Sequence, residues 1–298
     1  MHHITVCICT YKRPELLRRL LPRIEQQQTN GLFDISVVIV DNVKLKTAYK
    51  TISKYAIKSR IKINYFVEPE QNIAMARNKT IEHSTGDYIG FIDDDEFPDD
   101  RWLLNLYQAI QHYKADGILG PVLPYFETPP PSWVLKGKFF ERPVLETGQV
   151  LDWHNTRTGN ALVKKELFIK GGKWFDPSYG SGGEDRDFFR RMIEKCHKFI
   201  WCNEAPVFEI VPPHRWNKKI LIKRALLRGK MALNSTHSNT RSVIYSIAAI
   251  GIYTCFLPIS LIFGQHIFMN YLIKTCDHIG KVAAFLGLKL IDEKYVGV

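Results

Sequence analysis

The first 115 residues alternate between short apolar runs and stretches with helical periodicity. Apolar runs of about 4 to 8 residues are typical of buried strands, and helices of about 10 to 15 residues between them indicate βαβ units. Such units form a parallel sheet covered by helices, so this part predicts an α/β nucleotide-binding half. The predicted strands are residues 4–9, 35–41, 61–67 and 87–92, and the predicted helices are residues 14–28, 44–58, 73–83 and 100–113.

Six carboxylates fall within the stretch GFIDDDEFPDD, residues 90–100, around the end of the fourth predicted strand. Four of them are consecutive, and two like charges about 4 Å apart repel by roughly 1 kcal/mol in water and about 4 kcal/mol at a partly buried site. A solvated turn is one interpretation, because Asp and Pro are frequent in loops. The preceding strand favours a ligand site, because open α/β sheets bind ligands at the carboxyl ends of their strands. A bound cation would relieve the repulsion.

The chain has 298 residues and a formal net charge of +11, from 41 Lys and Arg against 30 Asp and Glu. Such an excess favours an anionic partner, which is a phosphate-bearing ligand, an anionic membrane surface or nucleic acid. The 6 cysteines include no CxxC pair, which argues against a zinc site or a disulfide framework and for a reducing compartment. The N-terminus enters a predicted strand at once, so we expect no signal peptide.

The last third of the chain combines a basic stretch with a long uncharged one. Residues 215–230 are rich in Lys and Arg, and residues 242–273 carry no formal charge, with Pro258 near their middle. The uncharged run exceeds the roughly 20 residues that span a bilayer, and a kinked span, a helical hairpin and an in-plane segment all fit it. We expect the basic stretch to bind an anionic membrane surface and the preceding part to lie on the cytoplasmic side. Nucleic acid is not expected, because the sequence carries no helix-turn-helix, zinc-finger or RNA-binding aromatic signature.

Six short motifs resemble, in their order, the inverting glycosyltransferases of family 2, and among them bacterial enzymes of polysaccharide assembly similar to succinoglycan glucosyltransferases. The resemblance implies the GT-A fold, a Rossmann-like mixed sheet flanked by helices, followed here by membrane-associated helices. It predicts a nucleotide-sugar half in residues 1–115, an acceptor and catalytic half in 116–213 and a membrane region in 214–298. The motifs are CTYKRP (9–14), VDN (40–42), QNIAMARN (71–78), FIDDDE (91–96), TGNALV (158–163) and GGEDRDFFRRM (182–192).

The resemblance implies that the acidic run is a DXD motif, in which Asp93 and Asp95 bind Mg²⁺ or Mn²⁺ beside the diphosphate of a nucleotide-sugar. This agrees with the preference of hard divalent cations for carboxylate and phosphate oxygens. Asp94 is expected to contact ribose or metal, while Glu96 and Asp99–Asp100 are expected to be solvated or to begin a helix. His214 is a candidate third metal ligand, with a surface position as the alternative.

The same resemblance implies further contacts with the nucleotide-sugar. An ordinary surface position is the alternative for Arg13, and structural helix positions are the alternative for the Arg77–Asn78 pair. Asp41 is expected to accept the imide N–H of the base. The implied contacts are Thr10, Tyr11, Arg13, Asp41, Asn72, Arg77, Asn78, Asp93, Asp94, Gly159 and Asn160.

Asp185 is the predicted general base, at the start of a helix expected over residues 184–195, and Glu184 is assigned to the acceptor. The alternative is that acids in the first turn of a helix only interact favourably with the helix dipole, which stabilises the helix by about 0.3 to 1 kcal/mol. We accept this alternative for Asp187. The expected reaction moves a hexose, from a UDP-linked donor, to a lipid-linked or nascent polysaccharide acceptor at the cytoplasmic face of a bacterial inner membrane. A nucleotidyltransferase of related fold and a non-catalytic membrane scaffold are the alternatives.

Overall fold

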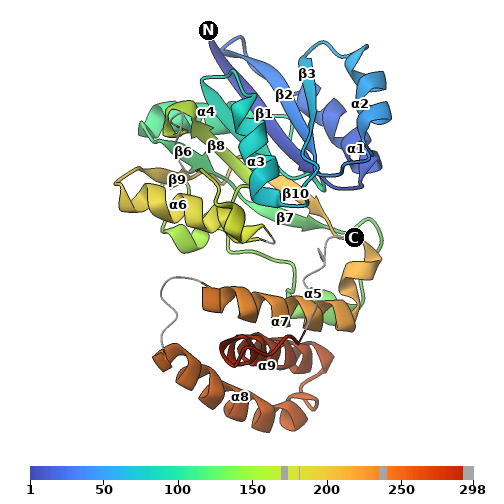
Figure 1. Ribbon diagram of the computed structural model, residues 1–298, viewed down its shortest axis with the longest axis vertical. Helices are drawn as coiled ribbons and strands as arrows, with labels where there is room; N and C mark the ends of the chain where they lie inside the picture. The colour runs from blue at the N-terminus through green and yellow to red at the C-terminus, as the bar shows by residue number, and fades with distance from the viewer. Residues whose placement is uncertain (169–173, 181, 235–239, 291–298) are drawn as a thin grey trace. The chain divides into compact units, whose positions relative to one another are not determined.

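The computed structural model describes residues 1–168, 174–180, 182–234 and 240–290 (Figure 1). The chain divides into two compact units, and each contains segments that are distant in sequence. The first unit comprises Met1–Tyr125 and Arg142–Ile210, and the second comprises Phe126–Glu141 and Val211–Val298. The predicted functional halves of residues 1–213 stay a prediction.

A seven-stranded mixed sheet forms the centre of the first unit, in the order β3-β2-β1-β4-β8-β6-β9 (Figure 1). The four predicted strands are confirmed as β1 to β4, and they run parallel to one another. β8 is antiparallel to both of its neighbours, β4 and β6, which makes the sheet mixed. The strands are β1 His2–Thr10, β2 Phe33–Asp41, β3 Lys62–Val67, β4 Tyr88–Ile92, β6 Gly117–Leu119, β8 Asn160–Lys164 and β9 Phe199–Trp201.

Residues along β1 alternate between two apolar clusters, as expected for a strand whose side chains point to opposite faces. Ile4, Val6 and Ile8 belong to one cluster, and Cys7 belongs to the other. The first cluster includes residues of α1 and α4, and the second includes residues of α3 and α6. The helices of this unit are α1 Pro14–Glu25, α2 Tyr49–Ala56, α3 Ile73–Glu82, α4 Trp102–Tyr113 and α6 Glu184–Glu194.

α2 is shorter than the predicted helix over residues 44–58. The Asp41 carboxylate accepts a hydrogen bond from the backbone N–H of Ala48 at 2.8 Å and one from the Thr47 hydroxyl at 3.3 Å. These bonds hold the chain between β2 and α2 in a turn, so the helix begins only at Tyr49.

A second, smaller sheet continues directly from the acidic run. It has three strands in the order β5-β10-β7, with β5 at Glu96–Pro98, β10 at Val207–Ile210 and β7 at Val122–Tyr125. β10 is antiparallel to β5, and Glu209 lies opposite Glu96 in their register. This sheet therefore brings a second glutamate beside the carboxylates that follow β4.

The second unit is helical, and its uncharged stretch is divided between two packed helices. α8 ends at Ser260 and α9 begins at Gln265, and α9 packs against α8, α7 and α5. Residues 242–273 therefore form two packed helices joined by a short turn, and not one continuous kinked helix. The helices are α5 Ser132–Gly137, α7 Lys218–Asn234, α8 Thr240–Ser260 and α9 Gln265–Phe285, and short 3₁₀ helices occur at Trp153–Asn155, Lys165–Leu167, Pro177–Tyr179 and Pro213–Trp216.

α7 and α9 approach each other closely at two glycines. A Cβ atom at Gly229 would overlap the carbonyl oxygen of Asp277, and one at Gly280 would overlap the carbonyl oxygen of Leu226. Arg228 forms an ion pair with Asp277 at 3.0 Å beside this crossing. The crossing therefore depends on the absence of side chains at both glycine positions.

Gly280→Ala is expected to lower the stability of the protein. Its Cβ would meet backbone rather than a movable side chain, and overpacking of this kind costs about 1 to 3 kcal/mol. Gly251→Ala in α8 is the matched control, because nothing lies within 4 Å of its Cβ position and alanine favours a helix over glycine by about 1 kcal/mol. Thermal unfolding of both variants in detergent measures the difference, and equal melting temperatures would contradict the crossing.

Candidate active site

The acidic run lies at the carboxyl end of β4, beside the end of β1. The Thr10 hydroxyl donates to Asp94 at 2.7 Å, and Arg13 Nη1 lies 3.1 Å from Asp94 Oδ1 and 3.2 Å from Asp95 Oδ2. The loop after β1, where Tyr11 also lies, thus meets the acids as the sequence predicts. In this structure Asp94 is buried and bonded to protein side chains.

Arg77 connects the acidic run to the start of α6. Its guanidinium lies 3.3 Å from Asp93 Oδ1 and forms an ion pair with Glu184. Arg77 and Glu184 are buried, while Asp93 is the most exposed of the three. The buried guanidinium of Arg77 in α3 therefore joins two other segments, the acidic run and the start of α6.

Asp185 follows Glu184 at the first turn of α6. Gly182 and Gly183 have φ angles of 127° and 97°, a region that favours glycine, and they set the direction in which the helix begins. Asp185 is partly exposed, and within the described part of the chain its carboxylate accepts a hydrogen bond only from the backbone N–H of Arg186, at 2.7 Å. By contrast, Asp187 pairs with Arg191 at 2.8 Å. The geometry leaves Asp185 accessible and gives Asp187 a partner within the helix.

Glu96 is neither solvated nor at the start of a helix, so the sequence prediction was wrong. It lies in β5 with 2% of its surface exposed, and its carboxylate accepts a hydrogen bond from the backbone N–H of Asp93 at 2.9 Å. A Cβ at Gly159 would lie 2.7 Å from Glu96 Oε1, so this glycine lets β8 pass close to the acids. Burial, followed by the nearby charge of Asp93, raises the pKa of Glu96 well above its ordinary value. Asp99–Asp100 are exposed, as expected.

Several predicted donor contacts have structural partners. Asn160 is 2% exposed; it accepts a hydrogen bond from the Trp102 indole at 2.7 Å and donates to two backbone carbonyls. Asn72 caps α3, Asn78 bonds the backbone of Phe175, and the buried Asp41 also accepts from the Tyr65 hydroxyl. These bonds favour structural roles in this conformation, and the contacts of these residues with a nucleotide-sugar stay predictions.

Burial and mutual repulsion raise the pKa of Asp95 to about 7. Burial is the largest cause, the charges of Asp94, Glu209 and Asp93 add to it, and Arg13 opposes it. Burial likewise raises the pKa of Asp94. A carboxylate cluster that keeps protons near pH 7 would be stabilised by a bound cation that replaces those protons.

The residues present fit a divalent cation, although the described residues include no group of three or more His, Cys, Asp or Glu side chains arranged to hold one. Mg²⁺ is commonly bound through one or two carboxylates together with substrate phosphates and water. Asp93 and Asp95 can supply two carboxylates. His214 belongs to the second unit, in the 3₁₀ helix Pro213–Trp216, and its role as a ligand stays a prediction.

Two charged residues beside the acids were missed from the sequence. Arg142 lies 2.6 Å from Glu209, and the carboxylates of Glu209, Glu96, Asp93 and Asp95 raise the pKa of Arg142 against the effect of its burial. Arg142 belongs to no motif in the sequence. Glu209 begins the segment EIVPPHRW, residues 209–216, into which the family resemblance extends, but that resemblance singled out His214 and not the glutamate.

Comparison with known proteins identifies the class of enzyme. Residues 5–172 match the family described as Glycosyl transferase family 2, and the chain belongs to that family. A relative from Rhizobium meliloti (strain 1021), succinoglycan biosynthesis protein ExoM, is 30% identical over 301 residues, which cover 98% of this chain and 95% of the relative. The resemblance predicted from the six motifs is thereby confirmed.

Solved structures support the predicted GT-A fold. One of S. aureus TarS 1-349 in complex with UDP-GlcNAc has a TM-score of 0.56 at 14% identity and covers 98% of this chain and 95% of that one. One of GalNAc-T7 with UDP, GalNAc and Mn²⁺ has a TM-score of 0.55 at 13% identity, over 73% of this chain and 45% of that one. At these identities the likeness concerns the fold alone, and the mixed α/β architecture is confirmed.

In the metal-free protein, the free energy of unfolding is expected to fall as the pH rises from about 4 to about 7. Because the pKa of Asp95 rises from 3.8 to about 7 on folding, the folded chain keeps a proton that the unfolded chain has released. The stabilisation that this proton gives is therefore complete below the pKa of the unfolded chain and is lost as the pH rises through the pKa of the folded chain.

Asp95→Asn should flatten this dependence, because asparagine does not ionise. Each unit of raised pKa corresponds to about 1.4 kcal/mol, and the partial exposure of the Asp95 side chain reduces the total to about 1 to 3 kcal/mol. Urea unfolding at several pH values measures the slope, with Asp100→Asn as an exposed control that should behave like the wild type. A slope unchanged by Asp95→Asn would refute the assignment.

Proposed function

We propose that this family 2 glycosyltransferase moves a hexose, with inversion, from a UDP-linked donor to a hydroxyl of a lipid-linked or nascent polysaccharide acceptor. The observation that carries the proposal is the position of Arg77, which contacts both Asp93 and Glu184. This guanidinium connects Asp93, one of the proposed metal acids, to the first turn of α6, which carries the proposed base. The relatives support the substrate classes, since one of them is a succinoglycan biosynthesis protein and one similar structure is a complex with UDP-GlcNAc.

The loop after β1 and the acids after β4 form the proposed donor site. Asp93 and Asp95 would hold Mg²⁺ or Mn²⁺, which neutralises the charge that develops on the leaving diphosphate. Arg13 already pairs with Asp94 and Asp95, and it would exchange these partners for phosphate oxygens when the donor binds. Thr10 keeps Asp94 in position through its 2.7 Å hydrogen bond.

Asp185 is the proposed general base. Its partly exposed carboxylate would take the proton of the acceptor hydroxyl as that oxygen attacks the anomeric carbon opposite the departing diphosphate, which inverts the configuration. Glu184 Oε2 is buried and has no hydrogen-bond partner among the described residues. This free acceptor atom supports a role for Glu184 in binding the hydroxyl of the acceptor.

Asp185→Asn should abolish transfer while leaving donor binding intact, because asparagine cannot take the proton. General bases contribute typically about 10²- to 10⁴-fold to rate, so the release of UDP should fall by that factor. Metal-dependent thermal stabilisation by UDP-sugars should remain, since a ligand that binds the folded state raises its stability.

Asp187→Asn is the control, because Asp187 pairs with Arg190 and Arg191. We expect it to lower the melting temperature and to keep most of the turnover. Full activity in Asp185→Asn would remove the residue from its proposed role. Release of pyrophosphate in place of UDP would identify the reaction as nucleotidyl transfer.

We also propose that the second unit holds the enzyme at the cytoplasmic face of a bacterial inner membrane. Among the described residues one helix, α8, is long and apolar enough to cross a bilayer, and only 17% of its most apolar window is buried. A core helix of a water-soluble protein would bury most of such a surface. The basic residues of α7 precede it, as expected for attraction to anionic lipid. Large apolar side chains exposed on α8 and the turn after it are Ile244, Tyr245, Ile247, Ile252, Phe256, Ile259, Leu261, Ile262 and Phe263.

The double variant Ile252→Asp/Ile262→Asp should reduce membrane binding without disturbing packing, since the two side chains are 60% and 82% exposed. Insertion of an Asp at the centre of a spanning helix costs about 2.5 to 3.5 kcal/mol. An Asp on a helix that lies in the membrane interface also opposes burial of that helix in the lipid. Leu45→Asp/Ile57→Asp, at 83% and 85% exposed positions of the first unit, is the matched control. Flotation with vesicles that contain anionic lipid measures binding, and equal flotation of both variants would contradict the proposal.

A further inference from the structure

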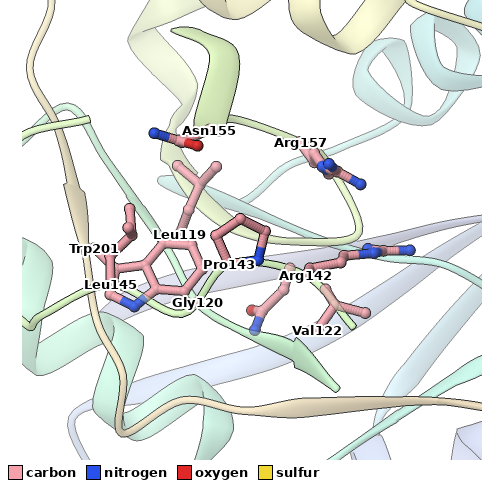
Figure 2. Close-up of a pocket in the computed structure, with 10 residues that line it drawn as sticks. Leu119, Gly120, Val122, Arg142, Pro143, Leu145, Asn155, Arg157 and Trp201 are labelled. Carbon is pink, nitrogen blue, oxygen red and sulfur yellow. The ribbon is translucent and has the colours of Figure 1, made fainter. Parts of the chain in front are cut away.

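A pocket in the first unit lies between the end of β6, β9 and the segment that follows Arg142 (Figure 2). Its walls combine apolar side chains with several hydrogen-bond donors. Figure 2 shows the side chains of Arg142 and Arg157 on the same side of the pocket. The lining residues are Leu119, Gly120, Val122, Arg142, Pro143, Leu145, Asn155, Arg157, Asn160 and Trp201.

Arg157 is a cation without a close partner. It makes no hydrogen bond or ion pair with any residue that the structure describes, although Asp185 and Glu209 lie near enough to act on its charge. Burial, together with the positive charges of Arg142 and Arg186, lowers the pKa of Arg157 to about 10. A half-buried guanidinium without a paired carboxylate would be stabilised by an anion.

Trp201 adds a second unpaired donor. Trp201 is 5% exposed, and its indole Nε1 is buried without a hydrogen-bond partner in the described part of the chain. An unpaired buried donor costs about 1 to 3 kcal/mol, so the pocket favours a ligand that brings an acceptor atom. Asn160 does not compete for that ligand, because its amide already donates to the carbonyls of Pro121 and Ala205.

The place of the pocket in the sheet separates it from the proposed nucleotide loop. β6 lies three strands away from β1 in the sheet order, a separation of about 14 Å at about 4.8 Å per strand. The charge of Asp185 acts on Arg157, and the charges of Asp93 and Asp95 act on Arg142, so the pocket adjoins both the proposed base and the proposed metal acids. A saccharide acceptor at the proposed base could therefore reach this pocket.

We propose that this pocket binds an anionic oxygen group, a carboxylate or a phosphate, carried by the acceptor saccharide. Arg157 would pair with the anion, and the apolar wall would contact the sugar ring beside it. Trp201, which Figure 2 shows on the side of the pocket opposite the two arginines, would donate from Nε1 to another oxygen atom of the saccharide. The inference rests on the proposed function, which makes the acceptor a saccharide, and it predicts an enzyme that selects acidic acceptors over neutral ones.

Ligand-detected NMR on the full-length protein in detergent tests the proposal without requiring turnover. The probes are methyl glucuronoside, glucose 6-phosphate and the neutral methyl glucoside, each added after the nucleotide site has been filled with UDP and Mn²⁺. We expect one or both anionic probes to bind at least tenfold more tightly than methyl glucoside. The anionic probe that binds more tightly tells whether the group is a carboxylate or a phosphate.

Arg157→Gln should weaken binding of the anionic probe at least tenfold, while Arg101→Gln, a change of equal charge at an exposed position, should not. A melting temperature within a few degrees of the wild type confirms that the Arg157 variant is folded. Equal binding by the Arg157 variant, or equal binding of methyl glucoside, would overturn the proposal. In a second experiment the anionic probe is added before UDP and Mn²⁺. Loss of the bound probe when UDP is then added would also overturn the proposal, because the probe would have occupied the donor site.

The result of this binding experiment is independent of the result of the turnover test of the proposed function. The probes report anion binding in the absence of transfer, so their result does not depend on turnover. Conversely, if the probes do not bind while UDP is released normally, the proposal of an acidic acceptor is rejected and the proposed glycosyltransferase reaction is retained.

Discussion

Repulsion among buried carboxylates governs the arrangement of the first unit. Asp94, Glu96, Glu184 and Glu209 are all buried around the end of β4, and each needs a cation or a proton. Arginines from three different segments meet this need: Arg13 after β1, Arg77 in α3 and Arg142 at the return of the chain from the second unit. The packing of α3, of α6 and of the small sheet against the acids therefore depends on where these guanidinium groups lie.

The sequence predicts the parts of this arrangement that depend on local periodicity. The four parallel strands and the helices between them follow from apolar runs whose residues alternate between two faces, as Ile4, Val6, Ile8 and Cys7 do in β1. The loop after β1 and the acids after β4 could also be predicted to meet, since neighbouring parallel strands end at the same edge of a sheet.

The remainder depends on pairings between residues far apart in the sequence. Nothing near Glu96 indicates that it enters a three-stranded sheet in which it lies opposite Glu209, so a solvated position was the natural expectation. Asn160 resembles a donor contact in its motif, yet its hydrogen bonds to Trp102, Pro121 and Ala205 hold segments together that only the fold brings near. Short strands such as β6 and β9 carry too few residues for a periodic signal.

The division of the chain sets an order in time for making the second unit. Phe126–Glu141 belongs to that unit, but its partner α9 ends at Phe285, and Asn270 of α9 donates to the carbonyl of Gly137. At about 5 to 20 residues per second of synthesis, this segment waits on the order of ten seconds on the ribosome before its partner emerges. During that interval the segment lacks its packing against α9, so the carbonyl of Gly137 has yet to receive its hydrogen bond from Asn270.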